Sequence, residues 1–77
     1  GPDGPVEIKA PMPGLVVDVE VTEGDEVAVG QGIAVIESMK MENEIRAETA
    51  GVAEKVLIQG GQTVDKGQSL VRIVPPE

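Results

Sequence analysis

The sequence contains no Cys, His, Phe, Tyr or Trp in its 77 residues. Without His or Cys, the usual nucleophile–base pairs and the soft-ligand metal sites cannot be assembled. Without Cys there is no disulfide, which suits the cytoplasm or the mitochondrial matrix. A chain of this length forms one domain with a thin core, and a large concave active site would remove side chains that the core needs. We therefore expect a domain that is not an enzyme by itself and that binds no metal.

Basic residues are scarce, because six Lys and Arg stand against 14 Asp and Glu and give a formal net charge of −8. Such a surface repels the phosphates of nucleic acid and anionic lipid, and the aromatic side chains that stack on single-stranded bases are absent. No apolar run approaches the ~20 residues of a membrane-spanning helix. We expect neither nucleic-acid binding nor direct membrane contact. The acidity itself has two open interpretations, solubility or recognition by a basic partner surface.

Short runs of Val and Ile, separated by glycines, fill most of the chain, and apolar residues alternate in two of them: Val6, Ile8 and Ala10, then Leu15, Val17, Val19 and Val21. Such β-branched runs favour strands, and no stretch shows sustained helical periodicity. The Pro- and Gly-containing ends predict linker or cloning-derived residues at 1–5 and a tail at 75–77, as if cut from a longer chain. The domain itself is expected over 6–74.

An internal repeat emerges when the sequence is shifted by 37 positions along itself. Ten pairs are identical without a gap: Glu7 and Glu44, Ile8 and Ile45, Ala10 and Ala47, Gly14 and Gly51, Val19 and Val56, Gly24 and Gly61, Val27 and Val64, Gly30 and Gly67, Gln31 and Gln68, Ile36 and Ile73. Each half supplies about four strands and cannot bury its apolar face alone. We expect an all-β, flattened eight-stranded barrel or sandwich of two four-stranded antiparallel sheets with approximate two-fold symmetry (a barrel-sandwich hybrid). The pairs Val19/Val56 and Ile36/Ile73 are expected to be buried.

The segment between the two halves, residues 37–42, reads Glu-Ser-Met-Lys-Met-Glu. By the symmetry of the repeat it forms a tight hairpin at the end of the molecule away from the termini. Two-residue hairpin turns favour Asn-Gly or Asp-Gly because positive φ is easy there, whereas Met39 and Lys40 occupy the centre here. Function is expected where local turn preferences are broken. Lys40 is therefore the candidate functional residue, and the alternative is an ordinary solvated lysine.

The chain is similar, over its whole folded length, to biotinyl (biotin carboxyl carrier) domains of the biotinyl/lipoyl superfamily. Those domains carry biotin on the Lys of an A-M-K-M hairpin preceded by an acid, and Ala10-Pro11-Met12-Pro13-Gly14 resembles their P-M-P-G segment. Ser38 departs from the pattern, since the family usually has Ala there. Gly14 to Gly24 reads as one uninterrupted strand region, which leaves no room for the "thumb" insertion of some bacterial carrier subunits.

The resemblance implies that a biotin protein ligase attaches biotin covalently to Lys40, a post-translational modification that makes the side chain a swinging arm. It also implies that this arm carries carboxylate from a biotin carboxylase site to a carboxyltransferase site. The parent would be a carboxylase of the ligase class, acting on an acyl-CoA or keto acid, or a decarboxylase. The domain itself would be a non-catalytic, monomeric carrier, since the cofactor does the chemistry.

The residues beside Lys40 are expected to contribute to recognition by the ligase: Glu37, Ser38, Met39 and Met41. For the two methionines, packing within the hairpin and an adaptable apolar collar for partner sites stay open. For Glu37 and Glu42, plain solubility and a charge that the ligase recognises stay open.

Two other functions are alternatives. A lipoyl carrier domain shares the fold and puts its Lys on the same hairpin, but usually as Asp-Lys-Ala, so Met on both sides favours biotin. An unmodified β-hairpin adaptor module would leave Lys40 without a role.

Overall fold

The computed structural model describes residues 4–76, so the first three residues of the expected linker and the last residue of the expected tail lie outside the described residues. The Val- and Ile-rich runs form eight strands: β1 (Val6–Lys9), β2 (Gly14–Val19), β3 (Glu26–Val27), β4 (Gly32–Ser38), β5 (Met41–Arg46), β6 (Gly51–Val56), β7 (Thr63–Val64) and β8 (Ser69–Val74). Within 4–76 no helix has the length and apolar character needed to cross a membrane.

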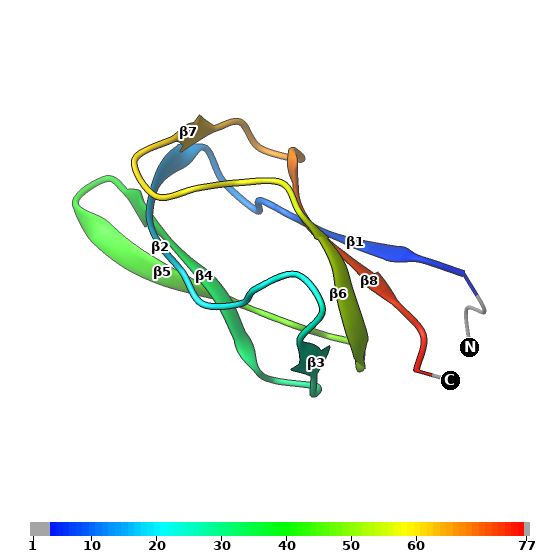
Figure 1. Ribbon diagram of the computed structural model, residues 1–77. Coiled ribbons are helices and arrows are strands. Elements are labelled where there is room, and N and C mark those ends of the chain that lie inside the picture. The colour runs from blue at the N-terminus through cyan, green and yellow to red at the C-terminus, as the bar shows by residue number, and fades with distance from the viewer. Residues whose placement is uncertain (1–3, 77) are drawn as a thin grey trace.

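The strands form two four-stranded antiparallel sheets that lie against each other (Figure 1). The order is β1-β8-β6-β3 in one, here called the terminal sheet, and β5-β4-β2-β7 in the other, the hairpin sheet. The predicted all-β fold is confirmed. Because the two sheets stay separate, the molecule is a sandwich and not a closed barrel.

The two halves of the repeat are interlocked, because each sheet takes two strands from each half. Shifting every strand of the terminal sheet to its repeat mate reproduces the order of the hairpin sheet. The register follows the same rule, since Val16 pairs with Ile36 as Ala53 pairs with Ile73. Neither half has a complete sheet of its own, so the predicted two-fold arrangement is confirmed.

The core lies between the sheets and consists of small and branched side chains: Ala10, Val16, Val21, Val27, Ile33, Ala34, Ile36, Ile45, Ala47, Ala53, Ile58, Val64, Leu70, Val71 and Ile73. Ile36 and Ile73 are 0% and 1% exposed, so that predicted pair is confirmed. Val19 and Val56 are equivalent, as predicted, but both are only half-buried against the core, so the prediction that they are buried is wrong. Each is the last residue of its strand.

Strand β2 is shorter and less regular than predicted. It ends at Val19, and the chain from there to Gly24 crosses to the other sheet to begin β3. A β-bulge at Val17 interrupts the simple alternation, so Val16 faces the core and Val17 is exposed. Gly24 has a φ of 96°, which suits a glycine at the turn of this crossing.

Candidate functional site

The turn between β4 and β5 lies at one end of an elongated molecule, whose extents are 39 × 20 × 18 Å (Figure 1). The described ends of the chain lie together at the opposite end. The repeat explains this placement, because the mates of β4 and β5 are β8 and β1, whose outer ends are the ends of the chain. The predicted position of the hairpin is confirmed.

The turn has an unusual backbone for its residue types. Ser38 pairs with Met41 across the hairpin, so Met39 and Lys40 are its two central residues. Their φ values are 54° and 66°, and no other non-glycine residue in the described part of the chain has a positive φ. Positive φ at both centres is the signature of a type I′ turn, whose twist matches its flanking strands. This left-handed conformation costs a residue with a Cβ roughly 1–2 kcal/mol, so the backbone is strained at both Met39 and Lys40.

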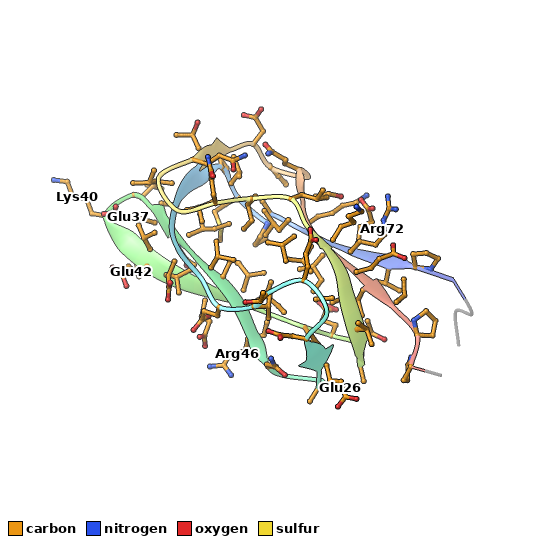
Figure 2. All side chains as sticks on the ribbon, viewed as in Figure 1. Glu26, Glu37, Lys40, Glu42, Arg46 and Arg72 are labelled. Carbon is orange, nitrogen blue, oxygen red and sulfur yellow. The ribbon has the colours of Figure 1, made fainter. Side chains whose placement is uncertain are left out.

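Lys40 extends from this turn into solvent, as Figure 2 shows. Within residues 4–76, none of the salt bridges involves its amine. The side chains on either side are also exposed, Met39 to 92% and Met41 to 67%. Such exposure leaves little packing for Met39 within the domain, so its thioether is available to another molecule. Ser38, at the base of the turn, is half-buried.

Two carboxylates lie on the strands behind Lys40 (Figure 2). Glu37 of β4 and Glu42 of β5 are direct cross-strand partners, and both are exposed. Side chains that pair in this way share one face of the sheet, and like charges at these positions destabilise it. The fold therefore tolerates an unfavourable pair beside the exposed amine.

Asn43 braces the hairpin, and it was not among the residues predicted for the site. Its Nδ2 donates hydrogen bonds to the backbone oxygens of Ile36, at 3.3 Å, and Met41, at 3.2 Å. The side chain therefore ties β4 to β5 close to the turn. The repeat could have indicated that Asn43 has a special role, because it aligns this polar residue with the apolar Val6.

Gly14 fixes how closely β2 approaches the hairpin strand β4. A Cβ at this position would lie 2.7 Å from Cγ2 of Ile36 and would collide with the backbone carbonyl of Glu37. Only a glycine permits that approach without displacing the residues that lead into the turn. This close approach gives a structural reason for the glycine of the P-M-P-G segment.

The assembled geometry presents one primary amine on a braced support. Within the described residues, no group of three His, Cys, Asp or Glu side chains is arranged to hold a metal ion. The hairpin brings together all the residues predicted for the site: Glu37, Ser38, Met39, Lys40 and Met41. An exposed amine of this kind can be acylated by an activated acyl donor.

Comparisons with known proteins agree with this geometry. The family described as "Biotin-requiring enzyme" matches residues 6–73. The mitochondrial propionyl-CoA carboxylase alpha chain of Homo sapiens is 48% identical over 66 residues, which are 86% of this chain and 9% of that protein. The biotin carboxyl carrier protein of Streptococcus mutans is 45% identical over 64 residues, 83% of this chain and 49% of that one.

The solved structure of a single-chain, multi-domain long-chain acyl-CoA carboxylase is similar in fold and sequence. It superposes with a TM-score of 0.89 at 30% identity, over 100% of this chain and 8% of that one. The chain therefore spans less than half the length of each of these three relatives. The family match runs from the first strand into the last and includes the hairpin. The chain belongs to the biotin-requiring enzyme family, and it is a biotin carboxyl carrier domain.

Proposed function

We propose that biotin is attached covalently to Nζ of Lys40 by a biotin protein ligase. The observation that carries the proposal is the strained turn, which holds this lysine at the far tip of a biotin-carrier fold. The residues fit the group, because an amide requires a primary amine that an activated acyl donor can approach freely. The other lysines, Lys9, Lys55 and Lys66, lie outside the hairpin.

The chain contributes a nucleophile and its presentation. The deprotonated Lys40 amine attacks the acyl carbon of biotinyl-adenylate, the new C–N bond forms, the bond between that carbon and the phosphate oxygen breaks and releases AMP, and the amine proton passes to solvent. The rigid turn keeps Nζ beyond the strand ends, where a ligase can reach it without unfolding the domain. Glu37, Ser38 and the two flanking methionines form the surface that the ligase meets around it.

The chain works, in this proposal, inside a biotin-dependent carboxylase of the ligase class. When bound, biotin supplies a ureido ring that accepts and donates a carboxylate. The domain, a monomer, presents that group in turn to a biotin carboxylase and to a carboxyltransferase, as parts of one assembly. The names of the relatives favour an acyl-CoA as the final acceptor. Both a mitochondrial and a bacterial relative are known, which fits the mitochondrial matrix or the cytoplasm.

Modification in vitro tests the proposal. Incubated with biotin, ATP and a biotin protein ligase, the chain should gain one biotin by intact mass, and Lys40→Ala should gain none. Lys40→Arg should also fail, because a guanidinium stays protonated. Lys55→Ala, a matched change on β6, should be modified like the wild type. Amide formation removes one positive charge, so the formal net charge of −8 becomes one unit more negative and the band shifts on a native gel.

Two outcomes would contradict it. Biotin on Lys9, Lys55 or Lys66 would show that the turn does not select the amine. Attachment of lipoate in preference to biotin, by a lipoate ligase, would make the domain a lipoyl carrier instead.

A further inference from the structure

The three methionines of the chain lie in two different environments. Met12 is half-buried and packs against the core, whereas Met39 and Met41 are 92% and 67% exposed at the hairpin tip. The chain has no Cys, His, Trp or Tyr. A mild oxidant that attacks sulfur and aromatic side chains therefore meets only thioethers here, and the two accessible ones lie on either side of Lys40.

We propose that Met39 and Met41 form a reversible oxidation site that controls how partner enzymes recognise Lys40. A sulfur lone pair attacks one oxygen of hydrogen peroxide, an S–O bond forms, the O–O bond breaks, and the leaving hydroxide takes the proton of the oxygen now bound to sulfur and becomes water. The sulfur loses two electrons and the peroxide gains two. The product, methionine sulfoxide, is polar and chiral where the thioether was apolar and flexible. The effect on recognition rests on the proposed function, but the oxidation itself does not.

The position of these two residues separates recognition from stability. A sulfoxide at Met12 would place a polar group against the core, which destabilises the fold. A sulfoxide at Met39 or Met41 stays in solvent in the free domain, so it leaves the stability of the fold unchanged. It has an effect only when a partner binds the hairpin and buries the sulfoxide. Burial of a sulfoxide that lacks a hydrogen-bond partner is unfavourable, so a surface that accommodates an apolar side chain should reject it. Exposure also leaves both sulfoxides open to methionine sulfoxide reductases.

Peptide mass spectrometry after limited treatment with hydrogen peroxide tests the chemical step. In the folded 77-residue chain, the sulfoxides at Met39 and Met41 should form at least about fivefold faster than the one at Met12. In guanidinium chloride, the three rates should become equal. Reductases specific for the two sulfoxide epimers should return the tip to its original mass. Oxidation of Met12 in the folded chain at the rate of Met39 and Met41 would overturn the proposal.

Ligase kinetics test the consequence. Oxidation at the tip should raise the KM of the ligase for the domain by about tenfold with kcat retained, since recognition and not the amine is altered. The double variant Met39→Leu/Met41→Leu should lose all sensitivity to peroxide, so that the KM of the ligase for it is the same before and after treatment. Met12→Leu, the matched control, should stay as sensitive as the wild type.

The outcomes separate the two proposals. An unchanged KM after full oxidation of Met39 and Met41, with an unchanged unfolding temperature, would overturn the inference and leave biotin on Lys40 intact. Absence of biotin on Lys40 in every form, oxidised or not, would overturn the proposed function, and the oxidation map would still report on the thioethers.

Discussion

The two sheets share one backbone plan but differ in how their acidic residues are neutralised. Glu7 in the terminal sheet and Glu44 in the hairpin sheet are repeat mates. Glu7 accepts a hydrogen bond from the Ser69 hydroxyl and another, 2.9 Å long, from Nε of Arg72. These two bonds lower the pKa of the Glu7 carboxyl, and Arg72 contributes further by its charge.

The equivalent place in the hairpin sheet lacks both donors, because the mates of Ser69 and Arg72 are Gly32 and Val35. Glu44 contacts Arg46 at 2.5 Å, and it also lies beside the carboxyl of Glu20. Partial loss of water, and then the neighbouring Glu44, raise the pKa of the Glu20 carboxyl.

The difference shows which parts of the duplication were free to diverge. Buried mates such as Ile36 and Ile73 stayed apolar, since they fill equivalent spaces between the sheets. Exposed mates differ in the sign of their charge or in their hydrogen-bond partners. The hairpin sheet, which leads into Lys40, holds more acidic than basic residues. An acidic surface there suits either of the interpretations of the charge, solubility or a basic partner.

Truncation of the buried isoleucines is the strongest test of the equivalence. Ile36→Ala and Ile73→Ala should each lower the free energy of unfolding by roughly 2–4 kcal/mol, because each leaves a cavity between the sheets. Val19→Ala and Val56→Ala should each lower the free energy of unfolding by less, since both side chains are only half-buried. Urea unfolding measures all four. A large loss for one isoleucine with almost none for the other would break the comparison.

Substitution of the repeat mates Gly14 and Gly51 should distinguish an effect on stability from an effect on the attachment of biotin. Gly14→Ala and Gly51→Ala each bring a Cβ to 2.7 Å from an isoleucine Cγ2 and into a backbone carbonyl, so both should destabilise by about 1–3 kcal/mol. Only Gly14 lies against the residues that enter the turn. Gly14→Ala should therefore slow attachment of biotin to Lys40, while Gly51→Ala should leave it unchanged at temperatures where both are folded. Equal attachment rates for the two variants would argue against this support.

The acidic residues should respond to pH with opposite signs. A lowered pKa means that Glu7 stabilises the fold above its unfolded pKa, an effect that is lost as the pH falls through the folded value. Glu7→Gln should lower the melting temperature at pH 7, and the difference should fade in acid. A raised pKa means that ionised Glu20 is unfavourable at neutral pH. Glu20→Gln should raise the melting temperature at pH 7, with a difference that disappears below the unfolded pKa. Shifts of the same sign at pH 7 would contradict the comparison.

The sequence predicted the features that depend on local signals. The repeat predicted eight strands, their interlocking and the burial of Ile36 and Ile73, because turn glycines and apolar runs mark strands directly. The Met-Lys centre between the two halves predicted an exposed Lys40, because the repeat places this segment in a tight hairpin. Its role as the attachment site stays a prediction.

The remaining features depend on contacts between distant residues. The bulge at Val17 shifts which residues of β2 face the core, and nothing in a Val-rich run marks it. The contact of Arg72 with Glu7 joins residues 65 positions apart. Asn43 braces a turn through backbone oxygens, a contact that exists only once β4 and β5 have paired.

The hairpin and the chain ends lie at opposite ends of an elongated sandwich, so a rotation at one end displaces the other. A rotation of the domain about its described ends, residues 4 and 76, would move the Lys40 tip through a wide arc, because the molecule is 39 Å long and the two lie at its opposite ends. A modest change of angle at the described ends is thereby converted into a displacement that a lysine side chain alone does not reach. The length of the sandwich, and not only the reach of the Lys40 side chain, then determines how far the hairpin tip moves.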